Sequence, residues 1–170
     1  MLRTLVFGLI ASLMFAQPGL AQVGAEPEFQ GAHSDWRVFT RGTGNSRICY
    51  ALSSPTEELP ASANHGEVFF IVASWANGDA VEQPNFLAGY PLRADNAPQA
   101  RVGSSRFDMF VSEQEGFLED PNDESRLVRS MRRGSVMRVE AVSARGTATA
   151  YEFSLSGVTA ALRQVGQLCG

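Results

Sequence analysis

Lysine is absent from this 170-residue chain, whose 14 basic residues are all arginines, and histidine occurs only as His33 and His65. The lack of lysine excludes Schiff-base chemistry and the phosphate-binding lysine of a P-loop. The scarcity of histidine disfavours a Ser-His-Asp hydrolase, whose serine needs a positioned base, and the G-x-S-x-G motif is also missing. His65 lies in the turn-like sequence SANHGE, so we expect it in a surface loop without a buried partner.

Metal-binding patterns are equally scarce. Two histidines and two cysteines do not form a zinc-ligand cluster. The segment 112–125 carries six carboxylates but lacks the ligand spacing of an EF-hand, so we expect a solvated loop leading into a helix, with a bound cation as the alternative. No pattern pairs two carboxylates as a glycosidase requires. The sequence therefore predicts no catalytic, cofactor-binding or metal-ligating residue, and we expect a protein that is not an enzyme.

The charge balance is mildly acidic, with a formal net charge of −4, and this argues against a nucleic-acid partner, which requires clustered positive charge. Arginines 126, 129, 132 and 133 form a basic edge that we expect to be a solvated helix face, with anionic lipid or glycan binding as the alternative. After Gln22 no stretch is long and apolar enough to span a membrane.

The N-terminus has the pattern of a secretory signal peptide. Arg3 precedes an apolar run over 5–15, and the small residues Gly19 and Ala21 suit signal peptidase, so we predict a signal peptide at 1–21 with cleavage before Gln22. The apolar run is too short to cross about 30 Å of hydrocarbon. Residues 22–34 are small and polar and are predicted as a flexible leader, followed by a single domain at 35–170. The expected location is periplasmic or associated with the outer membrane.

The two cysteines, Cys49 and Cys169, are predicted to form a disulfide, because an exported chain reaches an oxidising compartment. The bond would fasten the C-terminal segment to an early strand. Two unpaired thiols are the alternative, and no C-x-x-C motif indicates a redox pair.

Short segments of β-forming residues separated by turn residues dominate the chain. We predict strands in the segments 35–40, 46–52, 67–76, 85–92, 104–111, 135–143 and 147–155. In the last two, apolar and polar residues alternate, as in an antiparallel sheet with one wet face. Trp36, Phe69, Phe70, Trp75 and Tyr90 fall in these segments and are expected in the core, with a ligand platform as the alternative.

Two helices are predicted. The first covers 122–134, with Asn122 or Asp123 as N-cap and Gly134 at its end. The second has Ser156 as its predicted N-cap and an apolar stripe of Val158, Ala161, Leu162, Val165 and Leu168. Together the segments predict an all-β, mainly antiparallel, sandwich-like fold with one short internal helix and a C-terminal helix; a β-barrel and a mixed α+β arrangement are the alternatives.

Several short motifs follow one another along the chain. They are W-R-V at 36–38, S-R-I-C-Y-A-L at 46–52, G-Y-P-L at 89–92, F-D-M at 107–109, M-R-R-G-S-x-M-x-V at 131–139, S-A-R-G-T-x-T at 143–149, and S-L-S-G-x-x-x-A-L with a terminal cysteine at 154–169. In this order they resemble the invasion-associated locus B family of exported proteins of alphaproteobacteria. The chain departs from the family pattern at Tyr151-Glu152-Phe153 and at Gly116-Phe117.

The resemblance implies an exported, β-rich protein of the cell envelope without an assigned catalytic activity. We therefore expect a non-catalytic protein that makes contacts with a protein or surface partner in the envelope or on a host. A periplasmic hydrolase of unfamiliar design and an envelope-stabilising structural factor are the alternatives.

Overall fold

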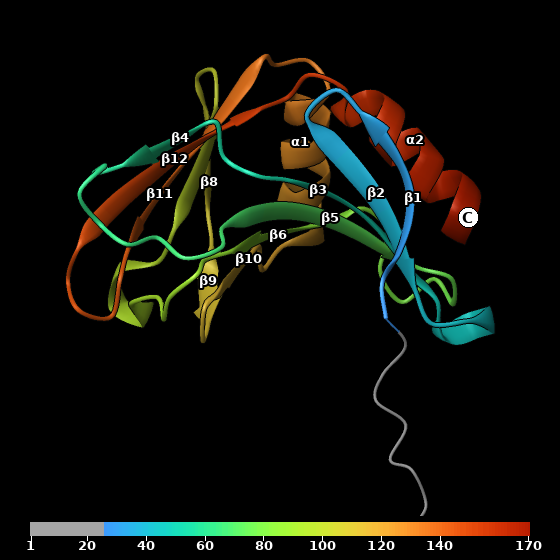
Figure 1. Cartoon of the computed structure of the whole chain (residues 1–170), viewed down its shortest axis with the longest axis horizontal. Helices are drawn as coiled ribbons and strands as arrows, with labels where there is room; N and C mark the ends of the chain where they lie inside the picture. The colour runs from blue at the N-terminus through green and yellow to red at the C-terminus, as the bar shows by residue number, and fades with distance from the viewer. Residues whose placement is uncertain (1–25) are drawn as a thin grey trace, which may run out of the picture.

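Two antiparallel sheets and two α-helices form residues 26–170, the part of the chain that the computed structural model describes (Figure 1). The seven-stranded sheet contains, in spatial order, β1 (Glu28–His33), β2 (Trp36–Arg41), β3 (Ile48–Ser53), β5 (Phe69–Trp75), β6 (Gln83–Leu87), β10 (Glu115–Phe117) and β9 (Phe110–Ser112). The five-stranded sheet contains β4 (Glu57–Leu59), β12 (Ala148–Ser154), β11 (Val136–Val142), β7 (Gln99–Val102) and β8 (Ser105–Asp108). Two short 3₁₀ turns, η1 (Gly44–Ser46) and η2 (Ala94–Asn96), lie in connections. The predicted all-β, sandwich-like fold is thus confirmed.

The core lies where the two sheets meet. On β5 and β6, Phe70 and Phe86 are fully buried and approach Phe153 of β12, with ring centroids 5.8 and 6.5 Å away. The indole of Trp36 is also fully buried and donates a hydrogen bond of 3.0 Å to the Ser154 carbonyl. The burial of these aromatic rings holds the sheets together.

The hairpin β11–β12 follows the predicted alternation. Met137, Val139 and Ala141 point into the core, whereas Val136 and Glu140 are exposed on the other face. The connecting turn contains Gly146 with φ of 91°, a conformation that glycine adopts without strain.

Helix α1 (Pro121–Met131) begins and ends close to the predicted positions, but its N-cap is Asp120, not Asn122 or Asp123. The carboxylate of Asp120 accepts a hydrogen bond of 2.8 Å from the Asn122 amide, and Pro121 occupies the first helical position.

Helix α2 (Val158–Cys169) is capped by Gly157, not by the predicted Ser156. Gly157 has φ of 90°, and its Cα lies so close to the His33 carbonyl that a Cβ would meet this oxygen at 1.9 Å. The apolar stripe of α2 is buried against the seven-stranded sheet, except for the partly exposed Leu168.

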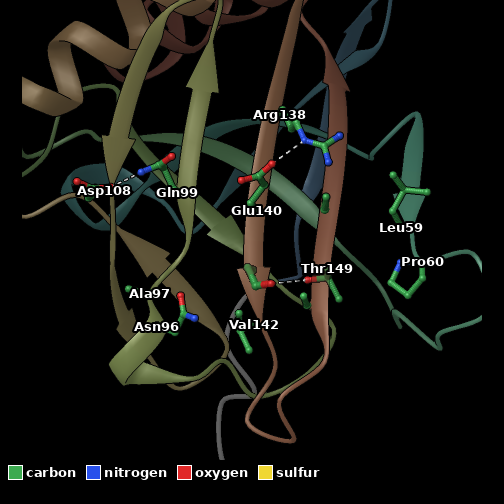
Figure 2. Close-up of a pocket in the computed structure, with 13 residues that line it drawn as sticks. Leu59, Pro60, Asn96, Ala97, Gln99, Asp108, Arg138, Glu140, Val142 and Thr149 are labelled. Carbon is green, nitrogen blue, oxygen red and sulfur yellow. Dashed lines mark hydrogen bonds and ion pairs between the residues drawn. The ribbon is translucent and has the colours of Figure 1, made fainter.

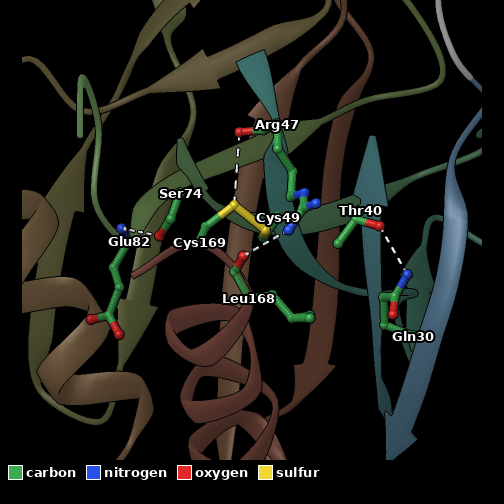
Figure 3. The surroundings of a disulfide bond; sticks show 8 residues. All are labelled: Gln30, Thr40, Arg47, Cys49, Ser74, Glu82, Leu168 and Cys169. Atoms are coloured by element: carbon green, nitrogen blue, oxygen red, sulfur yellow. Dashed lines mark hydrogen bonds between the residues drawn. A yellow bond between two sulfur atoms is a disulfide. The ribbon is translucent and has the colours of Figure 1, made fainter. Parts of the chain in front are cut away.

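The disulfide Cys49–Cys169 ties the last turn of α2 to the inner face of β3, as Figure 3 shows, and confirms the predicted pairing. The two Cα atoms are 5.9 Å apart. Arg47 donates a hydrogen bond of 3.4 Å to the Leu168 carbonyl beside the bond. The C-terminal helix is therefore held at both of its ends.

Several predictions of strands and loops also need correction. Residues 28–33, predicted as part of a flexible leader, form the edge strand β1, which pairs with β2 across a bulge at Gln30. Gln164 of α2 holds this strand by donating 3.0 Å to the Gln30 carbonyl. Strands β4 and β7 lie outside every predicted strand, and β10 lies in the acidic stretch predicted as a loop. The predicted signal peptide, 1–21, lies outside the described residues.

Within residues 26–170, neither helix has the length and apolar character needed to cross a lipid bilayer.

Candidate functional site

The seven-stranded sheet has an apolar face that points away from the core, which we call the outer face. Its side chains, identified from the strand register, are Phe29 (β1), Arg37, Phe39 and Arg41 (β2), Ile48, Tyr50 and Leu52 (β3), Phe69, Ile71, Ala73 and Trp75 (β5), Gln83, Asn85 and Leu87 (β6), Glu115 and Phe117 (β10), and Phe110 (β9). Both helices pack on the opposite side of this sheet (Figure 1).

Aromatic rings extend across the outer face to both of its edges. Phe29 packs edge-on against Phe39 at 5.5 Å, and Phe39 stacks on Tyr50 at 5.6 Å. At the other edge Phe110 stacks on Phe117 at 5.7 Å. Phe29 and Phe110 are 60% and 45% exposed, so the apolar character continues onto the two edge strands. Seven strands at a spacing of about 4.8 Å make this surface about 29 Å wide.

A groove of about 540 Å³ is hollowed into the outer face. Apolar residues, among them Leu52, Ile71 and Trp75, make up most of its lining, and the polar Asn85 lies beside Ile71 on the neighbouring strand. Arg41 marks one corner, because it shares a row with Ile48 and Trp75. Glu115 marks the diagonally opposite corner, in the row of Phe69 and Leu87.

Asn85 is the one described residue with a buried side-chain oxygen or nitrogen that lacks a hydrogen-bond partner. Its side chain lines the groove and the residue is only 9% exposed. Asn85 Nδ2 donates to Glu115 Oε2 at 2.9 Å, which leaves Oδ1 as the unsatisfied acceptor. An unsatisfied buried acceptor typically costs about 1–3 kcal/mol.

The Tyr50 hydroxyl on the outer face is partly buried. Burial raises the pKa of the Tyr50 hydroxyl, against the lowering influence of the Arg41 guanidinium. Tyr50 is thus an uncharged hydrogen-bonding group at neutral pH, next to a permanent cation.

Of the five aromatic residues expected in the core, Trp36 and Phe70 are fully buried and Tyr90 is partly buried against the core. The expectation is wrong for Phe69 and Trp75. The latter two are partly exposed on the outer face, because alternation along β5 places them opposite Phe70 and Val72. Apart from Ser74, the sequence of β5 is apolar on both faces of the sheet, so the sequence alone did not show that one face is exposed.

A second group, which we call the His65 cluster, is buried between the sheets. Its members are joined by hydrogen bonds: His65 Nδ1 to Tyr151 Oη at 2.8 Å, Tyr151 Oη to Tyr90 Oη at 2.7 Å, and Tyr90 Oη to Thr149 Oγ1 at 2.7 Å. His65 is only 6% exposed, so its predicted position in a surface loop without a buried partner is wrong. Its partner Tyr151 lies 86 residues later, which no local pattern reveals.

The contacts of His65 determine its tautomer. Its Nε2 lies 3.0 Å from the Pro60 carbonyl, which can only accept, so Nε2 carries a proton. In the neutral ring, Nδ1 then accepts from the Tyr151 hydroxyl. Burial raises the pKa of Tyr151 far above that of a free tyrosine, so this hydroxyl stays protonated. Neither contact of the His65 ring is with a carboxylate, and the cluster has the properties of a structural network and not of an activated nucleophile.

The outer side of the five-stranded sheet carries a second, polar groove of about 810 Å³, shown in Figure 2. Its charged side chains are already engaged. Arg138 donates to Glu140 at 3.0 Å and to Glu152 at 3.4 Å, and Gln99 donates to Asp108 at 2.6 Å. The hydrogen bond to Glu140 is the main cause of the raised pKa of Arg138.

The remaining chemically interesting residues from the sequence are dispersed. His33 lies on β1, where its Nε2 contacts Gln164 Oε1 at 2.7 Å. In the acidic stretch 112–125, Asp120 caps α1 and Asp123 pairs with Arg126. Among residues 26–170 no three histidine, cysteine, aspartate or glutamate side chains converge as metal ligands would.

Fold and surface together define a small disulfide-linked β-protein with an aromatic-rich sheet face that no other part of residues 26–170 covers. No protein-family model, no curated protein and no solved structure matches the chain.

Proposed function

We propose that this chain is an exported, non-catalytic protein of the cell envelope that acts by binding a protein partner through the outer face. The observation that carries the proposal is the continuity of this face, which runs across all seven strands. Contiguous apolar surfaces of this extent on soluble domains commonly mark interaction sites, whereas isolated exposed apolar residues do not.

The chemistry of the polar side chains supports a binding role. A hydrolase would need a histidine or carboxylate with access to substrate and a partner that activates it. His65 is instead buried against Tyr151 and the Pro60 carbonyl, and the carboxylates of the polar groove accept hydrogen bonds from Arg138 and Gln99.

Export is supported by the disulfide, because such bonds persist in oxidising compartments. The N-terminal sequence adds the pattern of a signal peptide. Resemblance to the invasion-associated locus B family leads to the same proposal: a protein that is periplasmic or associated with the outer membrane.

Site-specific crosslinking in intact cells tests the proposal. A photoreactive residue replaces Ile71, at the centre of the outer face, and in a matched control it replaces Val136, an exposed apolar residue of the other sheet. We expect one discrete crosslinked protein, identified by mass spectrometry, from position 71 and none from position 136. Expression of Ile71→Glu in a deletion strain should fail to reverse the deletion phenotype, because the variant introduces a charge into the outer face. Expression of Val136→Glu should reverse it.

Equal crosslinking from both positions, or full function of Ile71→Glu in a folded protein, would remove the outer face as the binding site.

A further inference from the structure

The described chain begins at the rim of the groove in the outer face. Pro27 lines this groove and directly precedes β1. The pairing of β1 with β2, and of β2 and β5 with β3, places this start at the end of the face that carries Ile48 and Trp75. Residues 1–25, which lie outside the described residues, are therefore attached at the rim of the groove.

The attached segment contains an apolar run whose chemistry matches the groove. Residues 5–15 include eight large apolar side chains, and no charged residue occurs between Arg3 and Glu26. Most of the groove lining is apolar, with Ile71 near its centre. An uncharged apolar run brings no charge onto this surface, and each apolar side chain that leaves water on binding lowers the free energy.

The connection is long enough for this run to reach the whole outer face. Phe15 precedes Pro27 by 12 positions, and a connection of this length spans up to about 40 Å. From Pro27, the most distant side chain of the face is Phe110, six strands across the sheet and four residues along it. With about 4.8 Å per strand and 3.4 Å per residue, this distance is about 32 Å.

Attachment at the rim favours this segment over a separate molecule. Short linkers typically give an attached group an effective concentration of about 1 mM. A second copy of the chain or a partner protein has to compete with that concentration. An apolar segment of the same chain is therefore the first occupant available to the face.

We propose that the apolar run 5–15 covers the outer face in the uncleaved chain, and that cleavage before Gln22 uncovers the face. This inference rests on the proposed function and states when the binding surface becomes available, which is after the chain has been exported and cleaved.

The segment that remains after cleavage is too short to replace the run. Ile71 lies three strands and four residues from Pro27, a distance of about 20 Å. The five residues 22–26 span at most about 18 Å, and Val23 is the one large apolar residue among them.

Crosslinking of the full chain tests the coverage. Cell-free synthesis without membranes supplies the uncleaved chain, in which a photoreactive residue replaces Ile71 or, in the matched control, Val136 of the other sheet. We expect position 71 to label a peptide from residues 5–15 and position 136 to label none. A mixture of isotope-labelled and unlabelled chains separates labelling within one molecule from labelling between two copies.

Tryptophan fluorescence measures the same contact without a probe. Trp75 lines the groove, whereas the second tryptophan, Trp36, is fully buried, and residues 1–25 contain none. The uncleaved chain should therefore emit at a shorter wavelength than the mature protein, and cleavage by purified signal peptidase should remove the difference.

Charges placed in the run test its role in this shift. Leu9→Asp/Leu13→Asp should emit like the mature protein before any cleavage, because the two charges resist burial on the apolar face. The control Thr4→Asp/Gln17→Asp adds the same charges outside the run and should keep the shift to shorter wavelength.

Several outcomes would overturn the coverage. They are labelling of 5–15 only between copies, which would make a second copy the occupant, equal labelling from positions 71 and 136, or the same emission from the uncleaved chain and the mature protein. If position 71 captures a partner in cells but does not label 5–15, the proposed function stands and the coverage fails. If it labels 5–15 but captures no partner, the face is covered before cleavage and the proposed function fails.

Discussion

At the scale of single residues, the His65 cluster is stable only as a complete set. Each hydroxyl in it has one proton, so the chain of donors runs from Tyr90 to Tyr151 and from Tyr151 to His65. Removing one hydroxyl leaves its neighbours unsatisfied in a buried place, which costs more than the net value of a hydrogen bond.

Tyr151→Phe should therefore lower the free energy of unfolding by about 1–3 kcal/mol. The matched control is Tyr50→Phe, on the partly exposed outer face, where we expect a change within about 0.5 kcal/mol. Urea denaturation at pH 7 measures both. A loss of similar size in the two variants would mean that the hydroxyl in the buried network contributes no more to the free energy of unfolding than a partly exposed hydroxyl does.

The pH dependence of this difference has a defined sign. The pKa of Tyr151 is raised in the folded protein, so above about pH 10 the unfolded chain releases the proton while the folded protein keeps it. The contribution of the Tyr151 hydroxyl to the free energy of unfolding is thus fully present below pH 10 and is lost as the pH rises further. Between pH 9 and 11 the gap between wild type and Tyr151→Phe should shrink by about 1.4 kcal/mol. Denaturation curves at these pH values measure the gap, and a constant gap contradicts the assignment.

At the scale of elements, the start of α2 depends on a glycine. Gly157 combines φ of 90° with a position at which a Cβ would stand 1.9 Å from the His33 carbonyl. Gly166 lies on the exposed side of the same helix, where a Cβ would point into open space.

The same substitution should consequently act in opposite directions at the two glycines. Gly157→Ala should destabilise the protein by about 2 kcal/mol or more, since β1 must move away from α2. Gly166→Ala should stabilise it by about 0.5–1 kcal/mol through helix propensity. Thermal melts of both variants decide the point, and a destabilised Gly166→Ala would show that the helix is not regular there.

The disulfide acts on the other end of α2. Its two cysteines are 120 residues apart, so the bond restricts most of the unfolded chain. Cys169→Ser should cost about 2–5 kcal/mol and lower the melting temperature by several degrees. Reductant should bring the wild-type protein to the level of the variant and leave the variant unchanged. Identical melting of the two under non-reducing conditions would exclude a stabilising bond.

Elements with strong periodicity were predictable, and those defined by distant partners were not. The hairpin β11–β12 shows its alternation locally, and the two cysteines had one available pairing. Strand β1, with Gly31 and Ala32, has weak β propensity and is defined by its pairing with β2 and by Gln164. His65 was misplaced for the same reason, since the turn-like sequence around it gives no sign of Tyr151.

At the scale of the whole molecule, exposed apolar residues fall into two kinds. Val81 and Val136 are 71% and 45% exposed and stand outside the outer face. Leu52, Ile71 and Leu87 are individually less exposed but adjoin one another on neighbouring strands of the outer face. Single exposed residues are ordinary on protein surfaces, whereas a continuous patch attracts apolar ligands.

A dye that fluoresces on exposed hydrophobic surface separates the two kinds. The triple variant Leu52→Thr/Ile71→Thr/Leu87→Thr keeps residues with good β propensity and should lose more than half of the dye signal. The control Val81→Thr/Val136→Thr removes more exposed side chains but should retain nearly all of it. Far-ultraviolet circular dichroism establishes that both variants are folded. If the control loses as much signal as the triple variant, dye binding depends on the total exposed apolar area and not on the continuity of the apolar patch. The outer face would then bind the dye no better than the rest of the surface.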